Sequence, residues 1–217
     1  YEELLKGYFG NNKFRGRLDG TLPRTGELSP RLLANALHVD TGETRKVPNI
    51  VKGRPPMLCK GCSHRDLFDA LNQVMADYPD PRVFGDIGCY TLGALPPYST
   101  ISTCVDMGAA ITMAKGAADA GVRPAVCVIG DSTFTHSGIT GLLDAVNDQS
   151  PVTVSISDNG TTAMTGGQSS AGTGRFHEIC KGVGVEEKHI RLIVPHRKIF
   201  DENVQVLKEE IDHEGVS

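Results

Sequence analysis

The middle of the chain contains two short apolar runs separated by a stretch with helical periodicity. The runs cover residues 124–129 and 151–157 and are rich in valine and isoleucine, as expected of strands buried in a sheet. Between them, residues 137–147 carry apolar side chains at helical spacing, namely Ile139, Leu142, Leu143 and Val146. The pattern predicts a βαβ unit, and therefore an α/β fold with a mostly parallel sheet and helices on both faces.

Each expected strand is followed by polar residues that suit a metal and a phosphate. Asp131 comes directly after the first strand, and Asn159 follows the second. The carboxyl ends of neighbouring parallel strands meet at one edge of a sheet, where open α/β folds bind ligands. We therefore expect Asp131 and Asn159 to converge and to hold a divalent cation through their oxygens. Gly130 would let the backbone approach a diphosphate, and the next helix would direct its N-terminus at it.

These motifs resemble a known cofactor-binding pattern. Gly130-Asp131-Ser132, followed after twenty-five residues by Asp158-Asn159, is similar to the motif of thiamine diphosphate enzymes. The extension Thr165-Gly166-Gly167-Gln168 resembles the 2-oxoacid:ferredoxin oxidoreductases. Within this family, residues 130–139 and 161–166 look most like the indolepyruvate ferredoxin oxidoreductase α subunit. The resemblance covers residues 54–217 and implies the three-layer thiamin diphosphate-binding fold.

The resemblance also implies which residues contact the cofactor and the metal. Mg²⁺ would be held by the side chains of Asp131 and Asn159 and by the backbone carbonyl of Thr161. Ser132 replaces a glycine of the general motif and should turn its side chain away from the diphosphate. Gly108 belongs to a stretch of small residues for which close helix packing is the plainer interpretation. The residues expected to bind the cofactor are Gly61, Cys62, His64, Gly88, Cys89, Gly108, Gly130, Asp131, Ser132, Thr133, Asn159, Thr161, Ala163, Met164 and Thr165.

Three cysteines are candidate metal ligands. Cys59 and Cys62 have C-x-x-C spacing, and Cys89 follows a short apolar run. In pyruvate-type relatives, cysteines in these places bind a [4Fe–4S] cluster with a fourth cysteine, whose position here would lie beyond Ser217. The alternatives are that the three remain reduced thiols, or that Cys59 and Cys62 form a disulfide in air. In a further alternative, Cys59, Cys62 and His64 bind zinc in an interaction module.

Two histidines are candidates for catalytic proton transfer, because imidazole titrates near neutral pH. His64 follows the cysteine pair, and His136 begins the helix after the metal motif. The structural alternative for each is a helix-cap or core histidine. Met164 stands where pyruvate-type relatives carry an asparagine, which favours a more apolar substrate pocket.

The sequence divides into an extension and a domain. Residues 1–53 are expected to form a linker-like extension with one docked helix over residues 27–38, because Ser29 can cap it and Pro30 suits its first position. Residues 47–56 read as an extended connector. Residues 54–217 form the expected cofactor domain, which stops before a final strand.

Further elements are expected within this domain. Ser63 would cap a helix, and residues 101–121 would form a closely packed helix. Residues 175–184 also look helical. A strand over residues 189–194 would precede an amphipathic helix that carries Ile199 to Ile211.

Composition narrows the class of protein. A net charge of −4 over 217 residues gives no footprint for nucleic acid, and no apolar run reaches the length of a membrane span. The six cysteines are too sparse for a secreted disulfide framework and no signal peptide is evident, so we expect a soluble protein in a reducing cytoplasm.

The expected function is the thiamine diphosphate- and Mg²⁺-binding part of an indolepyruvate ferredoxin oxidoreductase. The family decarboxylates 2-oxoacids oxidatively to acyl-CoA and passes the electrons to ferredoxin. Expected partners are a pyrimidine-binding domain, a β subunit, ferredoxin, coenzyme A and a second copy of the chain. Without the pyrimidine-binding half the chain should be inactive. The alternative is a non-redox thiamine diphosphate decarboxylase or synthase.

Overall fold

The computed structural model describes residues 1–10, 14–42, 48–53 and 55–217, and it divides into two units, Tyr1–Arg54 and Pro55–Ser217. The expected boundary at residue 54 and part of the expected connector over residues 47–56 lie outside the described residues. The two units are therefore considered separately.

The first unit contains the short helices α1 (Glu2–Phe9) and α2 (Pro30–Ala36). Helix α2 begins as the sequence predicts, because the Ser29 hydroxyl accepts a hydrogen bond from the Leu32 amide at 3.3 Å. Helix α1 was not expected; the Glu2 carboxylate accepts hydrogen bonds from the amides of the following loop. No residue of either helix is fully buried. Leu32, Asn35 and Ala36 of α2 nevertheless line a pocket together with Arg15, Thr21 and Pro23.

The second unit is built on three parallel strands in the order β1-β2-β3. These are β1 (Arg82–Gly85), β2 (Ala125–Gly130) and β3 (Thr153–Ser157). The central strand pairs Cys127 with Phe84 on one side and with Val154 on the other. A small antiparallel hairpin, β4 (Thr161–Thr162) and β5 (Gln168–Ser169), follows β3. The predicted α/β class with a mostly parallel sheet is confirmed.

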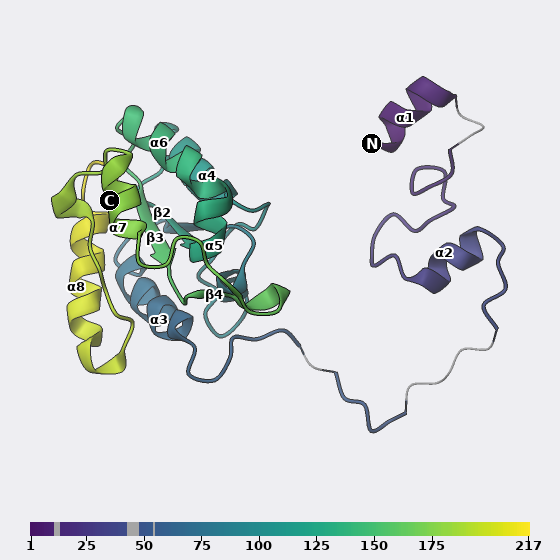
Figure 1. Cartoon of the computed structure of the whole chain (residues 1–217), viewed down its shortest axis with the longest axis horizontal. Helices are drawn as coiled ribbons and strands as arrows, with labels where there is room; N and C mark the ends of the chain where they lie inside the picture. The colour runs from purple at the N-terminus through teal and green to yellow at the C-terminus, as the bar shows by residue number, and fades with distance from the viewer. Residues whose placement is uncertain (11–13, 43–47, 54) are drawn as a thin grey trace. The chain divides into compact units, whose positions relative to one another are not determined.

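Helices cover both faces of this sheet, which gives three layers (Figure 1). Helices α3 (Ser63–Met75) and α8 (Phe200–Ile211) lie side by side on one face. On the other face lie α4 (Ala109–Asp119), α6 (Ile139–Asn147) and α7 (Phe176–Gly182). Short 3₁₀ turns occupy Cys89–Ala94, Ala163–Thr165, Glu187–His189 and Arg197–Ile199.

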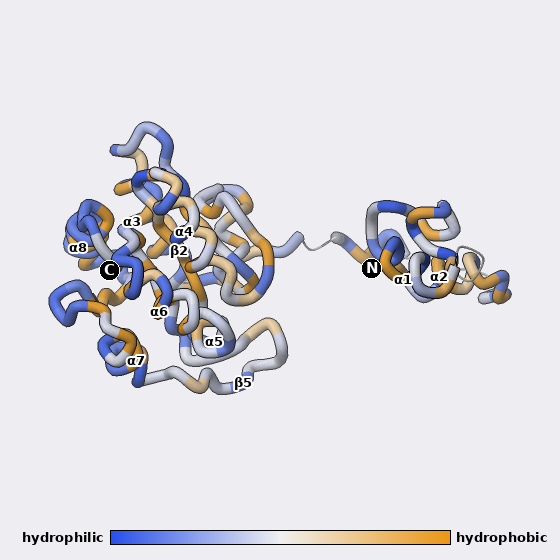
Figure 2. Tube along the Cα trace, turned by 90° about the horizontal axis from the view of Figure 1, so that it is seen from above, coloured by the Kyte–Doolittle hydropathy of each residue, from blue (hydrophilic) through white to orange (hydrophobic). Residues whose placement is uncertain are grey.

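Strand β2 joins the two hydrophobic cores. All its residues are buried, and alternate side chains point to opposite faces, as in any strand. Val126 and Val128 pack against α3 and α8, while Cys127 and Ile129 pack against α4 and α6. In Figure 2 hydrophobic segments gather around β2, and much of α8 is coloured as hydrophilic. Each fully buried aliphatic side chain here contributes roughly 1.5–3 kcal/mol.

Two local predictions are wrong. Ser63 is the first residue of α3, and Cys62 holds the N-cap position without a side-chain cap hydrogen bond. Residues 190–194 are extended but form no strand, because a cavity separates them from the edge of β3 and a ladder needs a partner backbone about 4.8 Å away. Among the described helices, none is both long enough and apolar enough to cross a membrane.

Candidate functional site

The carboxyl ends of β2 and β3 meet, as the sequence predicts. Gly130, the last residue of β2, pairs with Ser157, the last residue of β3. Asp131 and Asp158 follow these two residues directly. The chain after Gly130 turns at once into helix, through α5 (Asp131–Thr133) and a π-helical turn at Phe134–Gly138 that leads into α6.

Asp131 is a buried acid with an unused oxygen. Its Oδ1 accepts a hydrogen bond from the Ser132 amide at 2.6 Å, whereas its Oδ2 is buried and has no partner. Burial raises the pKa of Asp131, and the nearby Asp158 carboxylate raises it further, against the lowering effect of the Ser132 amide. Two adjacent carboxylates with an unpaired buried oxygen are chemically suited to a divalent cation.

The loop after β3 places its acid and its amide differently from expectation. Asp158 lies beside Asp131, while the Asn159 Oδ1 accepts a hydrogen bond from the Thr161 amide at 3.2 Å. The Asp158 Oδ1 likewise accepts from the Gly160 amide at 2.9 Å. Asn159 therefore has its carboxamide oxygen engaged within its own loop, and Asp158 is the side chain that faces Asp131.

Hydrogen bonds and short contacts join other predicted cofactor-binding residues to the ends of β2 and β3. The Ser132 hydroxyl contacts the Thr162 hydroxyl at 2.5 Å, which links α5 to β4. The Thr133 hydroxyl donates to the Ile87 carbonyl at 3.0 Å, which links α5 to the loop that carries Gly88 and Cys89. The exposed 3₁₀ turn with Ala163, Met164 and Thr165 reaches the same loop, because the Met164 amide hydrogen-bonds the Cys89 sulfur.

Asp86 and Tyr90 form a buried network beneath the site, which the sequence analysis missed. Asp86 is fully buried, and its Oδ2 accepts hydrogen bonds from the amides of Gly108 at 2.8 Å and Ala110 at 3.2 Å. Its Oδ1 accepts from the Tyr90 hydroxyl, which also donates to the Ile87 carbonyl. Burial raises the pKa of Asp86. Asp86 therefore fixes the start of α4 to the end of β1.

The glycines at this edge are needed for close approach. A Cβ at Gly130 would lie 2.6 Å from the Tyr90 ring, and one at Gly88 would lie 2.2 Å from the same ring. Gly108 has a φ of +93°, and a Cβ there would lie 2.3 Å from the Ser137 hydroxyl. Gly61 also has a positive φ, but its surroundings are open. The first three glycines keep the backbone bare where the strand ends and helix starts converge.

The cysteines lie near the same edge. The Cys62 Sγ contacts the His64 Nδ1 at 3.1 Å, and His64 is buried next to the Tyr90 ring at 6.4 Å between centroids. Burial lowers the pKa of His64. Burial raises the pKa of Cys89, and the charges of Cys62 and Cys59 raise it further, so both lie near Cys89.

The side chains of the expected cysteine and zinc ligand sets are not gathered around one point. Within the described ranges there is no group of three or more His, Cys, Asp or Glu side chains placed to hold a metal ion. This departs from the expected set of Cys59, Cys62 and Cys89, and equally from the zinc set with His64. The physical reason is that His64 is drawn into the core and holds the Cys62 sulfur, whereas Cys59 is exposed. All six cysteines are free in the structure, and a Cys59–Cys62 disulfide formed in air stays a prediction.

His136 is exposed, in contrast to His64. Its Nδ1 contacts the Ser137 hydroxyl at 2.9 Å, and this hydroxyl donates to the Met107 carbonyl at 2.6 Å. His136 thus lies on the helix that begins at Asp131, next to the residue that packs against Gly108. The arrangement leaves its ring accessible to a ligand.

Comparison with known proteins gives one family. The family described as thiamine pyrophosphate enzyme, C-terminal TPP binding domain, matches residues 86–216. The chain is 36% identical to the indolepyruvate oxidoreductase subunit IorA of Archaeoglobus fulgidus, with 100% of the chain and 38% of the relative covered. It is 35% identical to the subunit of the same name from Methanothermobacter thermautotrophicus, over 93% of the chain and 35% of the relative. The chain thus spans little more than a third of the length of these relatives.

Solved structures share the fold. A 2-oxoglutarate:ferredoxin oxidoreductase from Magnetococcus marinus superimposes with a TM-score of 0.55 at 18% identity, covering 76% of this chain and 63% of that chain. A benzoylformate decarboxylase from Polynucleobacter necessarius gives a TM-score of 0.53 at 16% identity, covering 86% and 38%. Both redox and non-redox enzymes therefore have this arrangement of strands and helices.

Proposed function

Because the chain belongs to the thiamine pyrophosphate enzymes, as their C-terminal TPP-binding domain, we propose that it is the diphosphate- and Mg²⁺-binding part of an indolepyruvate ferredoxin oxidoreductase. The supporting observation in the structure is the unpartnered, buried Oδ2 of Asp131 beside Asp158. Such an oxygen is costly to leave unpaired in the interior, and a divalent cation would satisfy it.

The residues at this edge have separate roles in the proposed site. Asp131 would hold Mg²⁺ together with the Thr161 carbonyl and the Asn159 carboxamide, which must leave its present partner, the Thr161 amide. Asp158 already faces Asp131 and would balance the positive charge. The bare backbone at Gly88, at Gly108 and at Gly130, with the helix start after Gly130, would receive the diphosphate.

Thiamine diphosphate, when bound, supplies a carbanion for addition to a 2-oxoacid carbonyl and a ring that accepts the electrons left when CO₂ departs. The residues of this chain would bind and orient the cofactor and the substrate. Ala163, Met164 and Thr165 form the exposed turn above the strand ends and would face the substrate side chain, where the thioether of Met164 suits an aryl group. Exposed His136 is the better placed of the two histidines to donate a proton, because burial favours the neutral form of His64.

The electron path would begin at the cysteines. We propose that Cys59, Cys62 and Cys89 hold a [4Fe–4S] cluster in the assembled enzyme, with a fourth ligand from outside these residues. Loading the cluster would require the three sulfurs to gather around one point. The Cys62 thiolate could keep a hydrogen bond from the His64 Nδ1, since such bonds to cluster sulfurs are common. The proposal places the enzyme in a reducing cytoplasm, where thiols persist.

The remainder of the active enzyme would come from other parts. A pyrimidine-binding domain would complete the cofactor site, and coenzyme A and ferredoxin would accept the acyl group and the electrons. A β subunit and a second copy of the chain are the proposed subunit partners. The chain alone should therefore bind cofactor weakly and turn over little or no 2-oxoacid.

Dye reduction by the assembled enzyme tests this function. With an aryl pyruvate and coenzyme A, the complex should reduce a viologen dye and form acyl-CoA, and Asp131→Ala should abolish both. Asp144→Ala is the matched control, because Asp144 is an exposed acid on α6 that pairs with Lys115. Aldehyde release without dye reduction would instead support a non-redox decarboxylase, an alternative kept open by the decarboxylase of the same fold.

A further inference from the structure

His136 and Ser137 lie in the π-helical turn Phe134–Gly138, between α5 and α6. Such turns are rare and often occur at functional sites. The exposed His136 ring places its Nδ1 2.9 Å from the Ser137 hydroxyl oxygen. That oxygen lies 2.6 Å from the backbone carbonyl oxygen of Met107, just before α4. One hydroxyl group therefore joins the imidazole to the backbone of another element.

The two contacts determine where the hydrogens lie. A carbonyl oxygen can only accept, so the Ser137 hydroxyl donates its single hydrogen to Met107. The hydroxyl oxygen then acts as an acceptor toward the imidazole, and the His136 Nδ1 must carry a hydrogen to donate to it. In the neutral ring, Nε2 is therefore the nitrogen with the free lone pair. Among the described residues, none forms a hydrogen bond with Nε2.

The backbone at the start of α4 fixes the Ser137 hydroxyl in this position. A Cβ at Gly108 would lie 2.3 Å from the Ser137 hydroxyl oxygen and 2.7 Å from the Ser137 Cβ, so the absence of a side chain there makes room for the hydroxyl. The buried Asp86 carboxylate holds the Gly108 amide at 2.8 Å. The acceptor for His136 is thus part of the packing between α4 and the π-helical turn.

We propose that Ser137 is a positioning residue that holds His136 in the Nδ1–H tautomer, so that His136 exchanges protons with a bound ligand through Nε2. The tautomer of a histidine is set by the hydrogen bond that its other nitrogen makes. The inference rests on the proposed function for the ligand on which His136 acts, whereas the tautomer follows from the two contacts alone.

The proton transfer itself is balanced at one atom. The neutral Nε2 accepts a proton from a hydroxyl, amine or thiol group of the ligand, whose bond to hydrogen breaks as the Nε2–H bond forms. The ring then carries the positive charge, and the ligand atom keeps the electron pair. The reverse step returns the proton from Nε2. The hydrogen bond from Nδ1 to Ser137 remains in both directions and keeps the ring orientation fixed.

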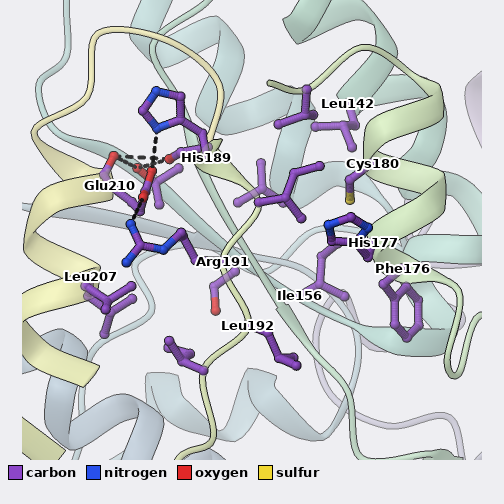
Figure 3. A pocket seen from close by; sticks show the side chains of 18 of the residues that line it. Leu142, Ile156, Phe176, His177, Cys180, His189, Arg191, Leu192, Leu207 and Glu210 are labelled. Carbon is purple, nitrogen blue, oxygen red and sulfur yellow. Dashed lines mark hydrogen bonds and ion pairs between the residues drawn. The ribbon is translucent and has the colours of Figure 1, made fainter. Parts of the chain in front are cut away.

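Two other histidines provide references for the two tautomers. The His189 Nδ1 lies 2.9 Å from the Glu210 carboxylate, which accepts only when ionised, so that Nδ1 carries a hydrogen (Figure 3). His196 has the opposite arrangement, because its Nδ1 accepts from the Lys198 amide at 3.1 Å. The neutral His196 ring therefore carries its hydrogen at Nε2. The three rings can be compared in one spectrum.

Long-range ¹H–¹⁵N NMR spectra of the full chain, labelled with ¹⁵N-histidine and without cofactor, test the tautomer. At about pH 8.5, where an ordinary imidazole is neutral, His136 should give the pattern of His189 and not that of His196. A histidine-to-glutamine variant at each position assigns the three rings. Ser137→Ala should lower the ratio of the Nδ1–H to the Nε2–H form of His136 by about fivefold to tenfold, the effect of one lost hydrogen bond. Thr140→Ala, which removes an exposed hydroxyl from the first turn of α6, should leave the ratio unchanged.

Kinetics of the assembled enzyme test the role of the tautomer. Ser137→Ala should lower kcat more than it raises KM, and it should have no further effect on kcat in the His136→Gln background, because Ser137 acts through His136.

Four results would overturn the proposal: an Nε2–H ring at His136 in the wild type, a tautomer ratio unchanged by Ser137→Ala, full activity of His136→Gln, or an equal effect of Ser137→Ala in both backgrounds. Absence of dye reduction by the wild-type complex would instead refute the proposed function, because the tautomer is measured without cofactor or substrate.

Discussion

Replacing Asp86 by alanine should destabilise the second unit strongly, although Asp86 contacts no expected ligand. The carboxylate is fully buried and accepts from the Gly108 and Ala110 amides and from the Tyr90 hydroxyl. Alanine would leave the two amides without an acceptor, while the tyrosine keeps the Ile87 carbonyl. An unpaired buried donor costs about 1–3 kcal/mol, so the free energy of unfolding should fall by about 2–6 kcal/mol.

The same residue offers a graded comparison. In Asp86→Asn the amide oxygen can still accept from Gly108 and Ala110, and its NH₂ group can donate to the Tyr90 oxygen. The loss should therefore be about 1 kcal/mol. Asp106→Ala is the control, since Asp106 is an exposed acid shortly before α4. Urea unfolding followed by far-UV circular dichroism gives the three values. An Asp86→Ala protein within about 1 kcal/mol of wild type, or an asparagine variant as unstable as the alanine variant, would refute the reasoning.

Two further predictions concern α4 and the C-terminal segment. Gly108→Ala should lower both the free energy of unfolding and the affinity for thiamine diphosphate, because a Cβ at φ +93° meets Ser137. At Gly116 a Cβ meets nothing within 4 Å, so Gly116→Ala should instead stabilise the second unit by about 0.5–1 kcal/mol. Urea unfolding and calorimetric titration measure the two effects, and equal behaviour of the variants would contradict them. Burial and the neighbouring His189 lower the pKa of His213, so the unfolded chain protonates first as the pH falls. The contribution of His213 to stability is thus present above the unfolded pKa of about 6.5 and is lost below it. His213→Asn should lose less stability than wild type between about pH 7.5 and about pH 5.5, and an equal or greater loss in urea unfolding would contradict this. The other charged groups that influence His213 are Glu210, Glu186 and Lys188.

The sequence predicts the strands, helices and helix starts that depend on local residue patterns. Hydrophobic periodicity places β2, α6 and β3, and the parallel pairing of Gly130 with Ser157 follows from the βαβ connection. Ser29 and Pro30 predict the start of α2, because capping and a fixed φ are properties of single residues. The strand over residues 189–194 fails because a strand also needs a neighbouring backbone, which apolar composition does not supply.

The part of the site that the sequence does not predict depends on side-chain direction. That Asp158, and not Asn159, faces Asp131 follows from the turn geometry of the loop. His64 turns inward and is buried beside the Tyr90 ring. Asp86, in contrast, can be found from the sequence. Gly85 ends β1 and is followed by Asp86, as Gly130 ends β2 and is followed by Asp131, and this repetition marks a second acid at the same edge of the sheet.

Cofactor binding by the chain itself tests the central claim most directly. In isothermal titration calorimetry, thiamine diphosphate should bind wild type only when Mg²⁺ is present, and Asp131→Ala should lose this binding while Asp144→Ala keeps it. Binding that is unaffected by removal of Mg²⁺ or of the Asp131 carboxylate would contradict the assignment of the metal and diphosphate to the joined ends of β2 and β3.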